Sequence, residues 1–319
     1  MLNKVVDLLK SSNNVSIYVH INTDCDAMGS SLALKLALES LGKKVDIYAN
    51  SNFPLAFEFY GEYIKTINTK TVEGKYDLVV CLDCASEGRL GKYKFTYRKG
   101  IENTLNIDHH ASNENYCKTN YIKNASSTCE MLFEIIQAMG VRFTSEMCKF
   151  LLSGIATDTG KFSHSVSVKT CIVVSKLLRF GRIQMEDITG PLFNSLTFEN
   201  FALMQKAYEK IEFYADKKLA VIMFDREDFI ETHTTLDDTD ALPDIPLQLK
   251  DVQFGILASE DDKGYFRVSF RSKGDISARA VAESFGGGGH KNASGCKIFG
   301  TFDDVKQQLI DNTLQILGW

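Results

Sequence analysis

The feature that most constrains the fold is the alternation of short apolar runs with helical patterns through the first half of the chain. The first run, at 15–20 (VSIYVH), is rich in β-branched and aromatic residues and precedes a helical pattern at 30–41, which ends at Gly42. Further strand patterns lie at 45–49, 76–82 and 104–107, and further helical patterns at 127–139, 145–152 and 169–180. Strands that alternate with helices are typical of a mostly parallel sheet covered on both faces. We therefore expect an α/β domain.

The second half of the chain predicts a smaller α/β domain. Its patterns are a helix at 198–214, strands at 219–224, 252–257 and 265–270, and helices at 277–284 and 303–317. We expect an N-terminal domain over 1–185, a helical linker over 186–216 and a second domain over 217–319, with a cleft between the two domains. The stretch 232–246 contains four aspartates and two prolines, which favours a mobile loop.

Composition limits the classes of partner. The 319 residues include 36 basic and 41 acidic side chains, and this net charge of -5 argues against a protein that coats long or duplex nucleic acid through a general positive field. No run of 18 apolar residues and no secretory signal is present, so we expect a cytoplasmic protein without a membrane partner. The eight cysteines are irregularly spaced, which favours free thiols.

Acidic and histidine side chains follow the predicted strands. Ligands of an open α/β sheet bind at the carboxyl ends of its strands, where this chain carries His20, Asp24, Asp26, Asp83, Asp108, His109, His110 and Asp158. A lone aspartate such as Asp83 or Asp158 is most often a helix cap or a turn residue, but four such places in one sheet make coincidence a poor explanation. Carboxylate oxygens and imidazole nitrogens suit Mn²⁺ or Mg²⁺, and the number of ligands exceeds what one ion needs. The sequence thus predicts a two-metal site for hydrolysis at phosphorus.

The motifs around these residues resemble the DHH phosphoesterase family, which is named for a triplet present here as Asp108, His109 and His110. The stretches that carry the resemblance are HINTDCDAMGS (20–30), LVVCLDCAS (78–86), NIDHHASN (106–113), SGIATDTGKFSH (153–164) and FRSKGDISARAVAESFGGGGHKNASG (270–295). The last resembles the DHH-associated substrate domain. Five motifs in the family's order cover nearly the whole chain, so the resemblance implies a catalytic DHH domain followed by a substrate-binding domain.

The resemblance also implies the roles of single residues. One metal set is His20, Asp24 and Asp83, and the other is Asp26, Asp83, His109 and Asp158. Asp83 would bridge the two ions, Asp108 would orient a neighbouring imidazole, and His110 would face the scissile phosphate. The first motif of the family usually carries Pro and Gly where this chain has Thr23 and Cys25, which leaves a Cys25 thiolate ligand as an alternative.

The glycine-rich stretch 286–289 offers a backbone that phosphate oxygens can approach closely. By resemblance, the residues that bind the terminal phosphate of a substrate are Arg271, Arg279, Gly288, Gly289 and His290. A cleft with metals on one domain and an anion site on the other points to the compact nano-RNase branch of the family. We therefore expect a phosphodiesterase and exoribonuclease with two Mn²⁺ ions, or Mg²⁺ instead, that degrades short RNA to 5′-mononucleotides and removes the 3′-phosphate of adenosine 3′,5′-bisphosphate (pAp).

Other functions stay open at this point. A phosphodiesterase for linear or cyclic dinucleotides, such as pApA or cyclic di-AMP, would carry the same motifs. A RecJ-like exonuclease would need room for a further nucleic-acid-binding domain, and a pyrophosphatase would need a C-terminal basic signature, which is missing here. A non-catalytic nucleotide-binding module would be expected to lose ligands, whereas this chain keeps all of them. A homodimer is one alternative for the oligomeric state, which the sequence does not determine.

Overall fold

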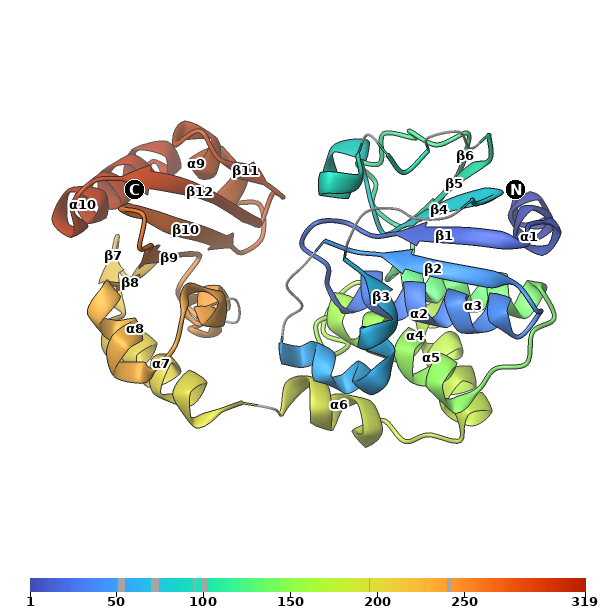
Figure 1. Ribbon diagram of the computed structural model, residues 1–319. Helices are drawn as coiled ribbons and strands as arrows, with labels where there is room; N and C mark the ends of the chain where they lie inside the picture. The colour runs from blue at the N-terminus through green and yellow to red at the C-terminus, as the bar shows by residue number, and fades with distance from the viewer. Residues whose placement is uncertain (51–54, 70–74, 95, 99–101, 195, 240–241) are drawn as a thin grey trace. The chain divides into compact units, whose positions relative to one another are not determined.

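The computed structural model describes the chain apart from residues 51–54, 70–74, 95, 99–101, 195 and 240–241. The chain forms two compact units, Met1–Ser195 and Leu196–Trp319 (Figure 1), and each is described by itself.

The first unit is built on a six-stranded sheet in the order β3-β2-β1-β4-β5-β6, and all of its pairings are parallel. The strands are β1 (Asn14–Tyr18), β2 (Lys44–Tyr48), β3 (Ile67–Asn68), β4 (Leu78–Leu82), β5 (Thr104–Asp108) and β6 (Thr119–Ile122). The predicted parallel sheet is confirmed, and β3 and β6 are additional to the four predicted strands. The chain runs from β1 outward to β3 and then returns to the other side of β1 with β4. This reversal of strand order opens a ligand-binding position at the carboxyl ends of β1 and β4.

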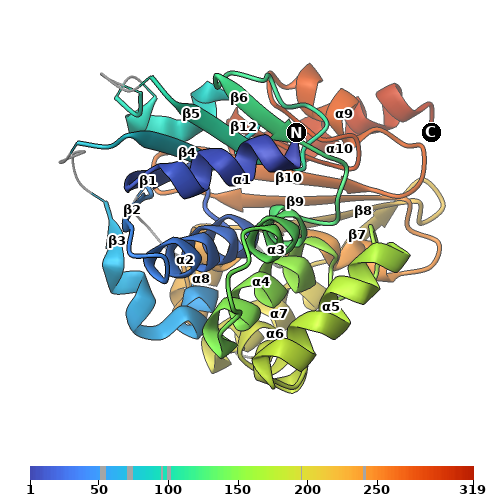
Figure 2. The same cartoon turned by 90° about the vertical axis from the view of Figure 1, so that its right-hand side faces the viewer.

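Helices cover one face of this sheet. They are α1 (Leu2–Ser11), α2 (Cys25–Glu39), α3 (Thr128–Ala138), α4 (Ser145–Asp158), α5 (Val168–Gly181) and α6 (Glu186–Phe193). In Figures 1 and 2, α2 and α3 lie next to the sheet, with α4 and α5 outside them. Helix α2 begins five residues before the predicted start because Asp24 caps it, and α4 runs six residues beyond its predicted end to Asp158.

Two glycines let α2 and α4 pack closely. A Cβ atom at Gly29 would lie 2.2 Å from the carbonyl oxygen of Phe150, and one at Gly154 would lie 2.8 Å from the Cα atom of Asp26. Backbones that approach this closely leave no room for a side chain. The two helices that carry Asp26 and Asp158 are therefore held in one fixed register.

The other face of the sheet is covered by tyrosines and turns rather than by helices. Tyr18, Tyr48, Tyr93 and Tyr97 form a buried cluster, in which the rings of Tyr18 and Tyr48 stack with their centroids 5.2 Å apart. Tyr93 belongs to the 3₁₀ segment η2 (Glu87–Tyr93), which follows β4. A second 3₁₀ segment, η1 (Leu55–Thr66), precedes β3.

The second unit has a mixed sheet in the order β11-β12-β10-β9-β8-β7, in which β8 and β9 pair in parallel and the other pairs are antiparallel. Its strands are β7 (Glu212–Tyr214), β8 (Leu219–Phe224), β9 (Phe254–Glu260), β10 (Tyr265–Ser272), β11 (Gly288–Gly289) and β12 (Ala293–Phe299). Its helices are α7 (Phe198–Glu209), α8 (Arg226–Thr232), α9 (Ala278–Ser284) and α10 (Phe302–Leu317). The second α/β unit is thus confirmed, although the helix predicted over 198–214 ends at Glu209 and gives way to β7.

Short 3₁₀ turns occupy the described part of the stretch predicted to be a mobile loop and the residues just after it. They are η3 (Leu236–Thr239), η4 (Leu242–Asp244) and η5 (Pro246–Gln248). The guanidinium of Arg267 donates to the carbonyl oxygen of Leu236 and to Thr239 Oγ1, so the strand β10 holds η3 in place.

All eight cysteines are free thiols, as the irregular spacing predicts. Among the described residues, no helix has the length and apolar character that a membrane crossing requires.

Candidate metal centre

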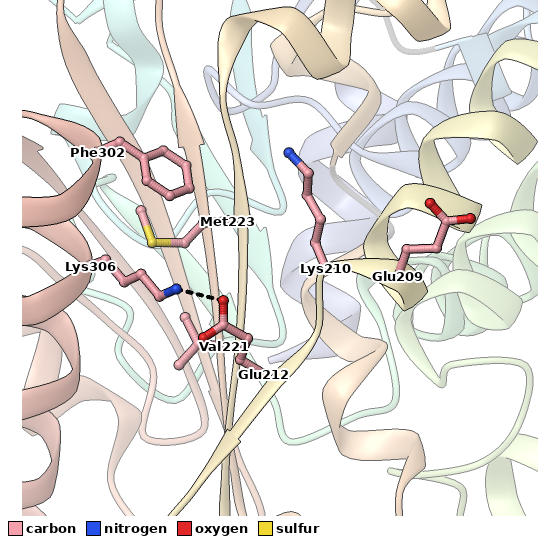
Figure 3. Close-up of a pocket in the computed structure, with 7 residues that line it drawn as sticks. All are labelled: Glu209, Lys210, Glu212, Val221, Met223, Phe302 and Lys306. Atoms are coloured by element: carbon pink, nitrogen blue, oxygen red, sulfur yellow. Dashed lines mark hydrogen bonds and ion pairs between the residues drawn. The ribbon is translucent and has the colours of Figure 1, made fainter.

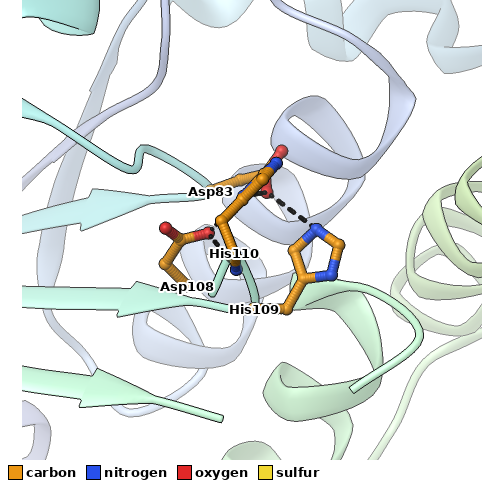
Figure 4. Close-up of side chains that lie close together, drawn as sticks. All are labelled: Asp83, Asp108, His109 and His110. Atoms are coloured by element: carbon orange, nitrogen blue, oxygen red, sulfur yellow. Dashed lines mark hydrogen bonds and ion pairs between the residues drawn. The ribbon is translucent and has the colours of Figure 1, made fainter. Parts of the chain in front are cut away.

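The predicted acidic and histidine residues meet at the carboxyl ends of β1, β4 and β5. Asp83 directly follows β4 and His20 follows β1 after one residue, while Asp108 ends β5 and leads into His109 and His110 (Figure 4). The remaining three come from helix ends: Asp24 caps α2, Asp26 lies in its first turn, and Asp158 ends α4. The structure therefore brings together all eight residues that the sequence singled out in this unit.

Asp83 lies at the centre of the cluster. Its Oδ2 is 3.5 Å from His20 Nε2, and its Oδ1 is 3.5 Å from both His109 Nε2 and His110 Nδ1. The side chain is 2% exposed, and the backbone has a φ of 52°, a left-handed conformation that aspartate tolerates better than most residues. Thr128 Oγ1 donates to Asp83 Oδ1 at 3.2 Å. The carboxylate of Asp83 thus faces histidines from two different strand ends.

The N-terminus of α2 fixes Asp24. Its Oδ1 accepts hydrogen bonds from the backbone N–H groups of Asp26 and Ala27, which makes it the helix cap. Its Oδ2 remains 3.4 Å from His20 Nε2. One carboxylate oxygen of Asp24 therefore caps helix α2, while the other faces His20 in the cluster.

Asp26 is fixed by the N-terminus of another helix. Its two oxygens accept from the backbone N–H groups of Thr128 at 2.7 Å and Cys129 at 2.8 Å, in the first turn of α3. Free N–H groups and the helix dipole favour a negative charge there. The carboxylate is fully buried, and these two backbone N–H groups orient it.

His109 joins Asp158 to the cluster. Its Nδ1 lies 3.3 Å from the carbonyl oxygen of Ala125, and its Nε2 lies 3.3 Å from Asp158 Oδ2. Among the described residues, the buried Nε2 has no hydrogen-bond partner. A hydrogen bond from Nδ1 to a carbonyl leaves Nε2 with a free lone pair, which is the arrangement of a metal-binding histidine.

The two carboxylate oxygens of Asp108 bond two different side chains, those of His110 and Asn113. Its Oδ1 is 2.7 Å from His110 Nδ1, and its Oδ2 accepts from Asn113 Nδ2 at 2.6 Å. These hydrogen bonds outweigh the effect of burial and lower the pKa of Asp108. The same bond to Asp108 raises the pKa of His110. The ring of His110 is thus oriented by Asp108, which is in turn held by Asn113.

Burial and crowding make the cluster electrostatically unfavourable on its own. Burial, followed by repulsion from neighbouring carboxylates including Asp83 and Asp24, raises the pKa of Asp26 and of Asp158 well above the usual range. Burial lowers the pKa of His20, but Asp24 and Asp83 outweigh it and raise that pKa to about 9. Bound cations would offset this repulsion.

The donor atoms are arranged in three groups that could each hold a metal ion. Within each group the donor atoms lie within 4.8 Å of one another. The first group is His20, Asp24 and Asp83, and the second is Asp26, His109 and Asp158. The third is Asp83, Asp108, His109 and His110. The first group has the same members as the first predicted ligand set, and the second group has the members of the second predicted set except Asp83. The donor set fits divalent cations, and so does the Nε2 of His109, which makes no hydrogen bond with the described residues.

The two departures in the first motif have structural consequences. Thr23 Oγ1 donates to the carbonyl oxygen of His20 at 2.8 Å and so closes the turn that follows β1. Cys25 is buried and belongs to none of the donor groups found among the described residues that could hold a metal ion.

Arg89 lies beside this centre and was not singled out in the sequence. Its carbonyl oxygen accepts from the N–H of Ile21 at 2.9 Å, which joins η2 to the residue after His20. The positive charge of Arg89 partly opposes the rise in the pKa of His110. At Cys84, burial raises the pKa of the thiol, and the charge of Arg89 offsets only part of that rise. Its guanidinium makes no hydrogen bond or ion pair with the described part of the chain. In the sequence, its position six residues after Asp83 is what would have pointed to Arg89 as a residue near the metal centre.

The predicted substrate-binding residues all lie in the second unit. Arg271 Nε bonds Asp244 Oδ1 at 3.1 Å, and Arg279 Nε bonds Glu283 Oε1 at 2.7 Å. The N–H of His290 donates to the carbonyl oxygen of Ala293 at 2.8 Å. Both arginines are therefore in surface ion pairs, whose contribution to stability is small.

The glycine-rich stretch forms the edge strand β11. Gly288 and Gly289 pair with Gly295 and Ser294 of β12. A Cβ atom at Gly287 would lie 2.2 Å from the carbonyl oxygen of Gly295, whereas one at Gly288 would meet nothing within 4 Å. Gly287 is thus required by its close approach to β12, while the backbone of Gly288 is open on its side-chain face.

Neither of the two pockets that the structure describes contains a predicted site residue. One, of about 190 Å³, lies in the second unit (Figure 3), where Lys306 bonds Glu212 beside Met223 and Phe302. The other is an apolar groove of about 620 Å³ along α5.

Comparison with known proteins agrees with the site. Residues 14–155 match the DHH family, N-terminal domain, and residues 216–317 match the DHHA1 domain. The chain therefore contains a DHH N-terminal domain followed by a DHHA1 domain, as the sequence motifs implied.

The chain is also similar to individual members. It is 27% identical over 304 residues to a protein of Thermus thermophilus named bifunctional oligoribonuclease and PAP phosphatase NrnA, across 93% of this chain and 88% of the relative. The crystal structure of an exopolyphosphatase-related protein from Bacteroides fragilis has a TM-score of 0.91 at 26% identity and covers 100% of this chain and 97% of that chain. RecJ from Thermus thermophilus in complex with Mn²⁺ has a TM-score of 0.54 at 15% identity over 98% of this chain and 53% of its own, which shows a shared fold.

Proposed function

We propose that this protein is a divalent-metal phosphoesterase that hydrolyses short oligoribonucleotides to 5′-mononucleotides and removes the 3′-phosphate of pAp. The observation that carries the proposal is the position of Asp83. Its carboxylate lies 3.5 Å from His20 on one side and 3.5 Å from His109 on the other. One carboxylate that faces two histidine donors is the arrangement expected of a ligand shared by two ions.

The ligands follow from the donor groups. One ion is proposed to be held by His20, Asp24 and Asp83, and the other by Asp26, Asp83, His109 and Asp158. Mn²⁺ is the proposed ion because the set mixes hard carboxylates with imidazoles, and Mg²⁺ is the alternative. Such ions activate water and neutralise charge on phosphate oxygens.

His110 is proposed to stabilise the negative charge that develops on the phosphate. Asp108 holds its Nδ1 at 2.7 Å, which fixes the ring and favours the charged imidazolium. The other ring nitrogen is then a donor for a phosphate oxygen, and donors aimed at developing charge lower the barrier to reaction. Asn113 supports this role because it holds the second oxygen of Asp108.

The second unit is proposed to bind the terminal phosphate of the substrate through Arg271, Arg279, Gly288, Gly289 and His290. Two arginines can bind phosphate oxygens in a bidentate manner, and the open face of Gly288 admits an oxygen close to the backbone. We propose a catalytic domain over 1–185, a linker over 186–216 and this substrate-binding domain over 217–319. The name of the Thermus thermophilus relative supports the choice of short RNA and pAp.

Side-by-side kinetics test the proposal. The full chain in Mn²⁺ is incubated with pAp, a three-nucleotide RNA, pApA, cyclic di-AMP and pyrophosphate, and kcat/KM is measured for each. The proposal expects the highest values for pAp and short RNA. Preference for cyclic di-AMP or pApA would establish the dinucleotide alternative, and turnover of none of the five would point to a binding module.

A further inference from the structure

Tyr60 connects a part of the chain outside all five motifs to the metal centre. It lies in η1, and its side chain is 1% exposed. Its hydroxyl donates to the carbonyl oxygen of Cys25 at 3.0 Å and lies 2.9 Å from Ser153 Oγ. The phenol therefore reaches two helices, α2 and α4, that are far apart in the sequence.

The carbonyl at Cys25 lies between two proposed ligands. Asp24 and Asp26 flank it, and the first turn of α2 fixes the spacing of their carboxylates. In a helix this carbonyl already accepts the N–H of the residue four positions later, so the bond from Tyr60 is additional. Its effect is to hold the peptide that joins Asp24 and Asp26 against displacement.

The contact with Ser153 connects the same hydroxyl to a third ligand. Ser153 lies in α4, whose last residue is Asp158, and its single hydroxyl proton is shared between the Tyr60 hydroxyl oxygen and the carbonyl oxygen of Phe150, which is 2.7 Å away. The next residue, Gly154, is where α4 approaches the carboxylate of Asp26. A single phenol thus lies where the helix of Asp26 meets the helix of Asp158.

We propose that Tyr60 is a positioning residue of the metal centre, which holds the α2 segment with Asp24 and Asp26 in register with the α4 segment that ends in Asp158. This inference rests on the proposed function, because it assumes that these carboxylates bind metal. It extends that function to a residue that neither contacts the ions nor lies in a motif.

The competing explanation is that Tyr60 only fills space. Its ring packs on Phe150 with centroids 5.4 Å apart, and packing of that kind would be kept by phenylalanine. Tyr60→Phe removes the hydroxyl and keeps the ring, so it separates the two explanations.

Tyr63 offers a matched control in the same segment. Its ring also packs on Phe150, with centroids 5.1 Å apart, and no hydrogen bond of its hydroxyl is found among the described residues. Tyr63→Phe therefore makes the same chemical change next to the same neighbour without touching the ligand-bearing peptides.

The experiment measures binding of Mn²⁺ to the metal-free full chain by calorimetry and by electron paramagnetic resonance, with circular dichroism as the check on folding. Wild type and Tyr63→Phe should bind two ions with equal affinity. Tyr60→Phe should bind about 10-fold more weakly, since changes to residues that orient ligands cost roughly 10–100-fold. Its kcat for pAp should fall at fixed Mn²⁺ while KM stays unchanged.

Ser153→Ala provides a second variant, because it removes one of the two contacts and keeps the bond to Cys25. Its Mn²⁺ affinity should lie between those of wild type and Tyr60→Phe. Folded Tyr60→Phe that binds two ions as tightly as Tyr63→Phe would overturn the inference while leaving the metal centre intact. Wild type that binds no Mn²⁺ would instead overturn the metal centre itself.

Discussion

A Cβ atom at position 154 would lie 2.6 Å from Oδ1 of Asp26, so the absence of a side chain at Gly154 is what admits this buried carboxylate. Gly154→Ala must therefore push Asp26 or α4 aside. We expect a loss of about 1–3 kcal/mol in the free energy of unfolding, as for other overpacked sites, together with weaker Mn²⁺ binding. Urea denaturation and calorimetry measure the two effects. Gly190→Ala is the control, because its Cβ would meet nothing within 4 Å, and an equal effect at both glycines would refute this reasoning.

Loss of Asp83 should abolish turnover. Asp83→Ala removes the carboxylate that faces both His20 and His109, so both proposed ions lose a ligand. We expect kcat for pAp to fall at least ~10³-fold, given that even indirect changes cost roughly 10–100-fold. The control is Asp7→Asn, which alters an exposed aspartate of α1. Activity near that of wild type in Mn²⁺ would be incompatible with a shared ligand.

Arg89 is expected to contact the substrate phosphate. It is half-buried, its backbone carbonyl pairs with Ile21, and its side chain makes no ion pair with the described residues, which leaves its charge available to an anion. Arg89→Ala should raise KM for pAp about 10-fold or more, because a hydrogen bond to a charged group contributes roughly 1.5–3 kcal/mol. Arg89→Lys should recover part of the loss, and exposed Arg142→Ala should change nothing. An unchanged KM in Arg89→Ala would remove this residue from the site.

His290 tests the substrate-binding role of the second unit separately from the metals. His290→Ala should raise KM for pAp and for short RNA while calorimetry still detects two Mn²⁺ ions. The reason is that every proposed metal ligand lies in the first unit, whereas His290 lies in the second. If His290→Ala weakened metal binding and left KM unchanged, the assignment of metal binding to the first unit and of substrate binding to the second would be wrong.

A buried carboxylate away from the centre should make stability depend on acid pH. Glu130 is 1% exposed, and burial raises its pKa, but hydrogen bonds from Ser126 and Thr170 and the charge of Lys169 outweigh burial and lower it. A depressed folded-state pKa means that the stabilisation is fully present above about pH 4.5, the value for an unperturbed glutamate, and is lost as pH falls through the folded-state pKa.

Glu130→Gln should therefore weaken this acid-dependent loss. Urea denaturation at intervals between pH 3 and pH 7 measures the free energy of unfolding for wild type, Glu130→Gln and the exposed control Glu146→Gln. The slope against pH should be smaller in Glu130→Gln than in the other two. Identical slopes in all three proteins would show that Glu130 does not titrate differently in the folded state.

The parallel sheet and the residues at its strand ends could be predicted because both depend on local patterns. Apolar runs identify β1, β2, β4 and β5, and the rule that ligands bind at carboxyl ends then selects the polar residues that follow. The start of α2 was missed because this helix is buried around most of its surface and so lacks an amphipathic pattern. Its signal is the cap at Asp24, six residues before the predicted start of the helix.

Other features depend on contacts that no local pattern encodes. Some residues contact the centre through partners that are distant in the sequence or lie across a turn. They are Tyr60, Arg89 and Asn113. Strand β12 was missed because its glycine, serine and lysine residues do not resemble a strand, and it forms by pairing with β10. The described part of the predicted mobile loop is held by Arg267, whose partners are 28 and 31 residues away.

The distribution of aromatic side chains gives each unit its own optical signal. The single tryptophan, Trp319, packs on the core of the second unit, whereas Tyr18, Tyr48, Tyr93 and Tyr97 form the buried cluster of the first. Tryptophan fluorescence during denaturation will therefore report the melting of the second unit. Near-ultraviolet circular dichroism from the stacked tyrosines will report that of the first, so one titration can reveal whether the two halves unfold together or in sequence.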